Sequence, residues 1–162
     1  MEHKFAINLQ HVHLSLKGNA GPIDILHSVD LQITQGSSCA LVGPSGSGKS
    51  SLLMVMAGLE QATSGRVTVL GEDISAMSEA ELAQFRRGRV GVVFQSSLLI
   101  PSMTALQNVA TELELAWLPD PFDRARAKLA DLGSALRSDN FPKKMSAGEQ
   151  QRVALAPALA PN

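Results

Sequence analysis

Apolar and polar residues alternate through most of the first 35 positions, which is the pattern of half-buried β-strands. The alternation covers residues 5–9, slips by one position, and resumes over 12–16, and a third run covers 29–33. The glycines and proline within 18–22 predict a turn between the second and third runs. The start of the chain is therefore predicted to be an antiparallel β region.

The pattern changes after residue 35. Residues 39–42 are continuously apolar and so are residues 90–94, as is typical of strands that are covered on both faces. Cys39 opens the first of these runs and is expected to be buried as a small apolar residue. A helix is predicted over 50–57, with Gly58 as its stop signal. Since short strands alternate with helices here, we predict an α/β fold.

The last third of the chain has the composition of helices. We predict one helix over 104–117 and another over 123–132. The segments Ser78–Glu81 and Ser146–Glu149 both have the S-x-x-E spacing of a capping box, in which each side chain bonds the other residue's backbone N–H. A helix is therefore expected to begin at each of them.

Composition excludes several classes of function. The 162 residues include 14 basic and 15 acidic ones, for a net charge of −1, so we expect no nucleic-acid partner. A single cysteine excludes an intrachain disulfide framework and a multi-cysteine zinc site. The sequence contains no apolar run of about 18 residues and no signal-like start, so a cytoplasmic protein is expected.

One segment has the residue types that phosphate binding requires. It fits the pattern G-x-x-x-x-G-K-[ST] at every position, between a predicted buried strand and a predicted helix. Glycines let backbone N–H groups turn inward around a phosphate, and the helix N-terminus adds its dipole. The lysine supplies a positive charge and the last hydroxyl an oxygen ligand for Mg²⁺. We assign nucleotide binding to Gly43, Pro44, Ser45, Gly46, Ser47, Gly48, Lys49, Ser50 and Ser51.

This motif alone fits kinases, GTPases and many ATPases, but two further segments narrow the choice. Residues 90–95 (V-G-V-V-F-Q) continue into L-I-P-S-M-T-A-L-Q-N-V, and residues 145–156 read M-S-A-G-E-Q-Q-R-V-A-L-A. These two segments resemble the Q-loop and the signature segment of ABC transporter ATPases, in their residues and in their order and spacing along the sequence after the phosphate loop. The residues of the Q-loop segment are most similar to those of ATPases from lipoprotein-release and macrolide-export systems. The resemblance covers essentially the whole chain.

The resemblance implies a partial ABC ATP-binding domain with an α/β P-loop fold. Its β region would be 1–35 with 65–75, its P-loop core 36–64 with 76–96, and its helical subdomain 97–150. The implied activity is ATP hydrolysis with Mg²⁺, which drives an integral-membrane permease from the cytoplasmic face of the inner membrane. The implied active unit is a head-to-tail dimer with a second ATP-binding subunit.

The family's residue roles carry over to matching positions. Lys49 and Gln95 would be catalytic, and Ser50 with Gln95 would hold the metal ion. Leu16 occupies the place of an adenine-stacking aromatic residue, where an aliphatic side chain lacks the π-face that favours the base. The signature would contact ATP of the other subunit through Ser146, Ala147, Gly148 and Glu149.

The sequence departs from the family pattern at several positions. Met145 and Ala147 replace the usual leucine and first glycine of the signature. Pro157 stands where the family has an arginine, so the last helix is expected to kink or end near Ala156. The printed sequence stops at Asn162, before the strand that would carry the catalytic glutamate. We therefore expect this chain alone to hydrolyse ATP poorly.

Two alternatives remain open at this stage. The chain could be a hydrolysis-deficient remnant or regulatory module that holds a nucleotide or a partner without turnover. It could also be a soluble ABC protein of DNA repair or translation. The near-neutral charge and the transporter-like residues of the Q-loop segment argue against this.

Overall fold

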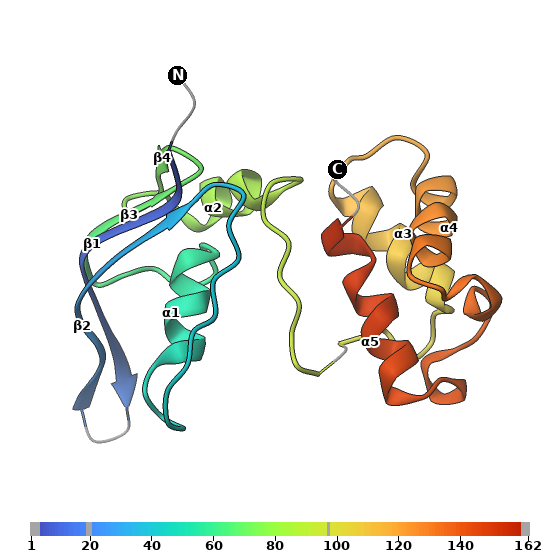
Figure 1. The fold of residues 1–162 in the computed structure, drawn as a ribbon, viewed down its shortest axis with the longest axis horizontal. Helices are drawn as coiled ribbons and strands as arrows, with labels where there is room; N and C mark the ends of the chain where they lie inside the picture. Colours follow the sequence, from blue (N-terminus) through green and yellow to red (C-terminus); the bar gives the residue numbers. More distant parts are fainter. Residues whose placement is uncertain (1–3, 19–20, 97, 160–162) are drawn as a thin grey trace. The chain divides into compact units, whose positions relative to one another are not determined.

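The computed structural model describes residues 4–18, 21–96 and 98–159, which form two compact units, Met1–Phe85 and Arg86–Asn162 (Figure 1). The elements of the first unit are β1 (Phe5–Gly18), β2 (Gly21–Thr34), α1 (Lys49–Met56), β3 (Ser64–Val69), β4 (Glu72–Asp73) and α2 (Glu79–Arg86), which runs one residue past the boundary. Those of the second are α3 (Ala105–Leu115), α4 (Pro121–Asp131), η1 (Ala135–Arg137), η2 (Pro142–Lys144), α5 (Ala147–Leu155) and η3 (Pro157–Leu159).

The slip in the alternation of the first strand is a β-bulge. Leu9 pairs with Leu31 and Val12 with Val29, so one extra residue is inserted in β1 between these two pairs. His11 takes the left-handed conformation there, with φ of 49°, and its backbone N–H donates to Oδ1 of Asp30 at 2.9 Å. Because the bulge restores the phase of the pleat, Leu9, Val12 and Leu14 are all buried. The predicted antiparallel β region is thus confirmed.

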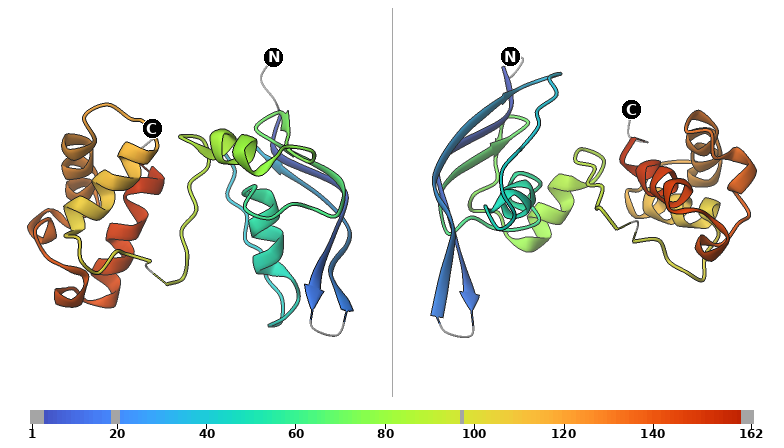
Figure 2. Two further views of the ribbon diagram at one scale, coloured as in Figure 1. Left: turned by 180° about the vertical axis from the view of Figure 1, so that it is seen from behind. Right: turned by 60° about the horizontal axis from the view of Figure 1, so that its bottom comes forward.

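The sheet is antiparallel in the order β2-β1-β3-β4, and α1 lies beside one of its faces (Figure 2). The core of this unit combines side chains of the sheet with those of α1 and α2. Its buried members include Leu9, Val12, Leu14, Leu26, Leu52, Val55, Met56, Val67, Val69, Ile74, Leu82 and Phe85. Helix α1 confirms the predicted helix, and Gly58 just beyond its end has φ of 67°, which suits a glycine stop.

The two predicted buried strands are wrong. Residues 39–42 and 90–94 are not in a strand, and their side chains are largely exposed, Val42 at 85% and Val93 at 45%. Cys39, expected to be buried, is exposed as well. A strand of a parallel sheet takes its hydrogen bonds from neighbouring strands. Among the described residues, every strand pairs within the antiparallel sheet. Neither apolar segment therefore has a neighbouring strand with which to form backbone hydrogen bonds.

The second unit is a helical cluster built on α3, α4 and α5. Its buried side chains are Ala105, Leu106, Val109, Ala110, Leu113, Ala125, Leu129, Met145, Val153 and Ala156. Reciprocal capping boxes begin both α3, at Thr104 with Gln107, and α5, at Ser146 with Glu149. Helix α5 ends at Leu155 and Pro157 starts a 3-10 turn, as expected because proline cannot donate an N–H to the helix.

Candidate nucleotide-binding site

The phosphate loop enters α1 through two glycines in the left-handed region. Gly46 has φ of 81° and Gly48 has φ of 80°, and α1 begins at Lys49 as the motif predicts. A Cβ added to Gly43 would come within 3.1 Å of Ser47 Oγ and 3.9 Å of Lys49 Cδ, so the missing side chain leaves space inside the loop. A phosphate group needs this kind of cradle, in which small residues let it approach the backbone N–H groups. The residues present therefore fit such a group.

Lys49 folds back over the loop that precedes it. Its Nζ donates to the carbonyl oxygen of Pro44 at 2.5 Å and to Oγ of Ser47 at 3.2 Å. Ser47 Oγ also donates to Pro44 O at 2.9 Å, which closes the loop on itself. The ammonium group is thus held at the mouth of the glycine loop, where phosphate oxygens could replace the carbonyl oxygen as acceptors.

Ser50 and Ser51 follow in the first turn of α1. Ser50 is exposed and, within the described part of the chain, its hydroxyl makes no hydrogen bond. Ser51 is half-buried. The free oxygen of Ser50 is of the type that Mg²⁺ prefers, since this hard cation takes oxygen ligands.

The start of α1 packs against β2. A Cβ on Gly48 would lie 3.0 Å from the carbonyl oxygen of Ile25 and 3.2 Å from Leu26 Cδ2, so only glycine allows this approach. Helix α1 begins at the end of the unit where β1 and β2 approach their connection (Figure 1). Leu16 pairs with Ile23 at this end, and the two side chains are 38% and 55% exposed. An apolar surface therefore flanks the two strands near the loop.

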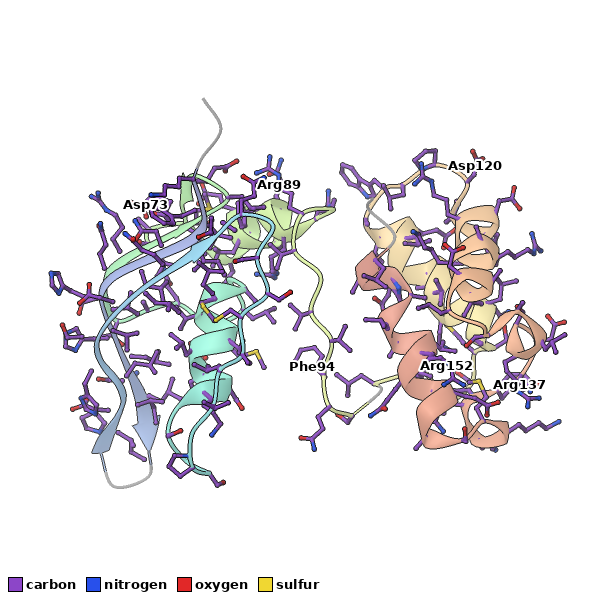
Figure 3. All side chains as sticks on the ribbon, viewed as in Figure 1. Asp73, Arg89, Phe94, Asp120, Arg137 and Arg152 are labelled. Atoms are coloured by element: carbon purple, nitrogen blue, oxygen red, sulfur yellow. The ribbon has the colours of Figure 1, made fainter. Side chains whose placement is uncertain are left out.

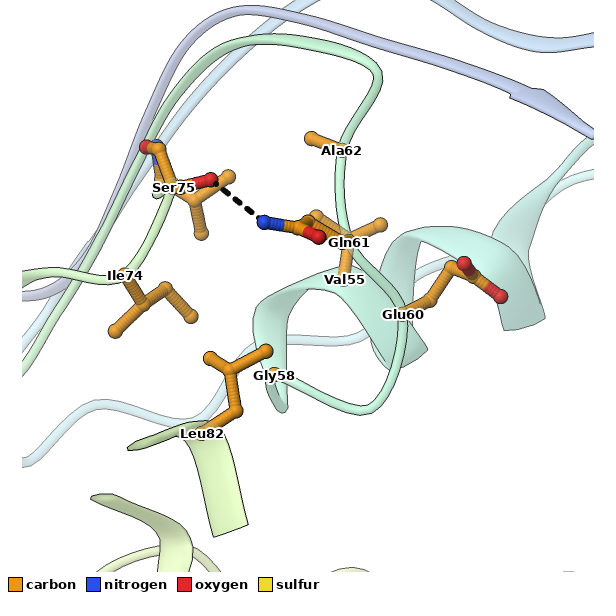
Figure 4. Close-up of a pocket in the computed structure, with 9 residues that line it drawn as sticks. Val55, Gly58, Glu60, Gln61, Ala62, Ile74, Ser75 and Leu82 are labelled. Atoms are coloured by element: carbon orange, nitrogen blue, oxygen red, sulfur yellow. Dashed lines mark hydrogen bonds between the residues drawn. The ribbon is translucent and has the colours of Figure 1, made fainter. Parts of the chain in front are cut away.

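A small cavity in the first unit is too narrow for a nucleotide. It measures about 10 Å³ and is lined in part by Val55, Gln61, Ser75 and Leu82 (Figure 4). The side-chain amide of Gln61 donates to the backbone oxygen of Ser75 at 3.2 Å and to that of Met77 at 3.3 Å. The space is that of about one water molecule.

The signature segment forms the N-terminus of α5. Ser146 Oγ accepts a hydrogen bond from the backbone N–H of Glu149 at 3.4 Å, and Glu149 Oε2 accepts from the backbone N–H of Ser146 at 2.8 Å. The predicted capping box is therefore confirmed, with Ala147 and Gly148 exposed in the first turn. Met145, which replaces the usual leucine, is buried in the helical core.

Arg137 contacts the signature segment, a contact that no pattern in the sequence predicts. Its Nε lies 2.6 Å from Oε1 of Glu149, whose side chain is 18% exposed. Hydrogen bonds from the Ser146 backbone N–H, from Arg137 and from the Ser146 hydroxyl lower the pKa of the Glu149 carboxyl to about 2. The arginine lies twelve residues before the glutamate, so no helical or strand periodicity connects them.

Gln95 belongs to the second unit, whereas the phosphate loop belongs to the first. It is exposed and follows the extended segment 90–94 rather than a strand, which corrects the expected buried strand before it. Val93 and Phe94 line an open cavity of about 410 Å³ with residues of α5, among them Gly148 and Arg152. Figure 3 shows Phe94 and Arg152 with their side chains.

Comparisons with known proteins agree with these motifs. The profile of the ABC transporter family matches residues 26–162. The chain is 42% identical over 155 residues to YbbA of Escherichia coli K12, an uncharacterized ABC transporter ATP-binding protein, across 94% of this chain and 68% of that one. It is 44% identical over 139 residues to the lipoprotein-releasing system ATP-binding protein LolD of Geobacter metallireducens, across 85% of this chain and 62% of that one.

A solved structure supports the same assignment. The ATP-binding cassette MJ0796, in a dimeric post-hydrolysis state bound to ADP and Pi, superposes with a TM-score of 0.88 at 34% identity. The alignment covers 96% of this chain and 70% of the cassette. No helix among the described residues has the length and apolar character needed to cross a membrane. The chain thus belongs to the ABC transporter family of ATP-binding proteins, which are ATPases with an α/β P-loop fold.

Proposed function

We propose that the chain binds Mg²⁺-ATP at the loop Gly43–Ser50 as part of the motor of an ABC transporter. The observation that carries the proposal is the position of Lys49, whose ammonium is held at the mouth of a glycine loop by Pro44 O and Ser47 Oγ. A phosphate would take over these contacts and offer the lysine a charged acceptor in place of a carbonyl. The α1 N-terminus adds backbone N–H groups and the positive end of its dipole.

Each residue of the proposed site has a physical role. The backbone of Gly43–Gly48 surrounds the phosphate, Lys49 carries the compensating charge, and Ser50 offers an oxygen to the metal ion. Bound Mg²⁺ supplies the positive charge that phosphoryl transfer to water requires. Leu16 provides apolar contact for the base, since it is 38% exposed beside Ile23. For Gln95 we propose the role that the family resemblance implies, in which its side-chain amide bonds a metal-bound or attacking water.

The signature helix is proposed to act on a second subunit. Its first turn has N–H groups without intrahelical partners, which form an anion site by their own geometry. In a head-to-tail dimer, Ser146, Ala147, Gly148 and Glu149 would contact the γ-phosphate of ATP held by the other subunit. The dimeric state of the MJ0796 cassette supports this arrangement.

The permease partner and the location follow from the family. The relatives are named as ATP-binding proteins of lipoprotein release and of other ABC transporters, so an integral-membrane permease is the proposed partner. The subunit would then be peripheral on the cytoplasmic face of the inner membrane. Co-purification of the tagged chain with a membrane permease from solubilised membranes tests this, and its recovery with ribosomes or DNA-repair complexes instead would contradict it.

Nucleotide titration tests the proposed site directly. We expect Mg²⁺-ATP to bind the chain, and Lys49→Ala to weaken binding by about a hundredfold because a charged hydrogen bond to phosphate is lost. Lys143→Ala removes the same charge from an exposed position on η2 and is the matched control. Equal affinities for the two variants, measured by calorimetry with and without Mg²⁺, would contradict the assignment.

A second candidate is a module that holds nucleotide without turnover. Residues 36–59, which include the whole phosphate loop and α1, contain no aspartate or glutamate. A general base for the attacking water must lie within hydrogen-bond reach of it. Steady-state phosphate release separates the two candidates: turnover by these 162 residues that Lys49→Ala abolishes supports the ATPase, whereas binding without turnover supports the module.

A further inference from the structure

The signature segment of this chain carries a negative charge, on Glu149, although its proposed role is to contact a phosphate. Glu149 is the third residue of α5, and its pKa of about 2 keeps the carboxylate ionised at neutral pH. Within the part of the chain that the structure describes, the N–H groups of Ala147 and Gly148 in the same turn have no hydrogen-bond partner, and they are the groups that would face a phosphate. An uncompensated carboxylate one or two residues away repels an anion at that place.

Arg137 compensates the negative charge of Glu149 and holds its carboxylate away from the N–H groups of Ala147 and Gly148. Glu149 uses Oε2 to accept from Ser146 N and Oγ, at 2.8 and 3.0 Å, and Oε1 to accept from Arg137 Nε at 2.6 Å. Both carboxylate oxygens are thus turned back toward the cap and toward η1. Figure 3 shows Arg137 beside the start of α5.

The backbone around Arg137 is held firmly, so its side chain has a fixed origin. Arg137 N donates to Ser134 O at 3.0 Å, and Asn140 N donates to Arg137 O at 2.9 Å. The next carbonyls bond to the start of α3: Leu106 N donates to Ser138 O and Ala105 N to Asn140 O, both at 2.9 Å. The segment 137–140 therefore connects the N-termini of α3 and α5, through Ser138 and Asn140 to α3 and through the Arg137 side chain to α5.

We propose that Arg137 is a positioning residue of the signature helix, which fixes the Glu149 carboxylate on the cap and compensates its charge so that the Ala147 and Gly148 N–H groups can donate hydrogen bonds to a phosphate. The fixing role concerns this chain by itself. The phosphate role rests on the proposed function, in which the phosphate belongs to ATP of a second subunit.

Two measurements on the full chain test the proposal, with Arg126→Ala as the matched control. Arg126 also pairs with a carboxylate of the second unit, Asp123, at 3.0 Å. Carbon-13 NMR titration of Glu149 should show its pKa rising from about 2 in Arg137→Ala and remaining unchanged in Arg126→Ala. An unchanged Glu149 titration in Arg137→Ala would overturn the proposal.

The second measurement is Mg²⁺-ATP-driven self-association by sedimentation. Arg137→Ala should raise the dimer Kd about tenfold, and Arg137→Lys, which keeps the charge but not the planar guanidinium, about threefold. In the Glu149→Gln background, Arg137→Ala should change Kd by less than about twofold, since no charge remains to be compensated. Equal effects of Arg137→Ala in both backgrounds would mean a merely structural role and would overturn the proposal.

The design separates failure of this inference from failure of the proposed function. If the wild-type chain binds no nucleotide or does not self-associate, the proposed function or its dimer fails, and the phosphate role of Arg137 fails with it. The Glu149 titration then decides the fixing role alone. If Arg137→Ala does not fold, Arg137→Lys replaces it. The effect of Arg137→Lys on the dimer Kd is then compared between the wild-type and the Glu149→Gln backgrounds.

Discussion

The side-chain amide of Asn108 closes the loop that runs from Ile100 into α3. Its Oδ1 accepts from the backbone N–H of Ile100 at 2.7 Å, and its Nδ2 donates to the carbonyl oxygens of Ile100, Met103 and Thr104 at 3.2, 3.1 and 2.9 Å. Asn108 is buried, at 6% exposure, and its side chain adds to the single backbone bond within this turn, from Met103 N to Ile100 O at 3.1 Å, among the described residues.

Replacing Asn108 by alanine should destabilise the second unit. The backbone N–H of Ile100 would lose its part-buried bond to the Asn108 side chain, at a cost of about 1–3 kcal/mol. Urea unfolding followed by the fluorescence of Trp117, the single tryptophan of the chain, reports this unit. Glu114→Ala, at an exposed position of α3, is the control and should change stability by less than about 0.5 kcal/mol. Equal unfolding midpoints for both variants would contradict the role of Asn108.

Two glycines of the phosphate loop should differ in their tolerance of alanine. Gly46→Ala places a side chain at φ of 81° in open space, which costs about 1 kcal/mol in backbone strain. Gly48→Ala adds a contact of 3.0 Å with the Ile25 carbonyl oxygen to the same strain, for a total of about 2–3 kcal/mol. Hydrogen exchange of α1 amides measures the difference. Equal protection in the two variants would show that the helix start does not press against β2.

The stability of the second unit should depend on pH through Glu149. Its pKa is lowered from 4.5 to about 2 in the folded chain, so the ionised form favours folding. This contribution is complete above pH 4.5 and is lost as the pH falls from 4.5 toward 2. Glu149→Gln should therefore lose less stability over that interval than the wild type in Trp117-detected urea unfolding. Glu114→Gln, which should behave like the wild type, is the control, and parallel losses in all three proteins would refute the prediction.

Cys39 should react with a thiol reagent in the folded chain. Its side chain is exposed, in a segment without strand pairing, so burial does not protect it. We expect a rate of labelling within about threefold of that of the urea-unfolded chain. Cys39→Ser, which should show no labelling, gives the background. A thiol that reacts only after unfolding would mean that residues 39–42 are covered after all.

The features that the sequence predicted correctly are those that short segments of chain decide. The capping box at Ser146, the end of α5 before Pro157 and the glycine stop after α1 each depend on hydrogen bonds or steric limits within a few residues. The bulge at His11 is also local in origin, since a slip in the alternation requires an extra residue if the same face is to stay buried. The phosphate motif is local as well, because its chemistry lies within eight consecutive residues, and its role in nucleotide binding stays a prediction.

Other features depend on what lies next to a segment in space. The apolar runs 39–42 and 90–94 look like buried strands, but a strand exists only where a neighbour takes its hydrogen bonds. The pairing of Arg137 with Glu149 arises from the turns between α4 and α5, and the bonds of Asn108 arise from the path of 100–104. Local sequence thus determined the caps, the bulge and the loop chemistry, since their energies come from adjacent residues. Whether an apolar segment forms a strand, and where the Arg137 guanidinium lies, depend instead on the folded arrangement, since the partners of these groups are distant along the chain.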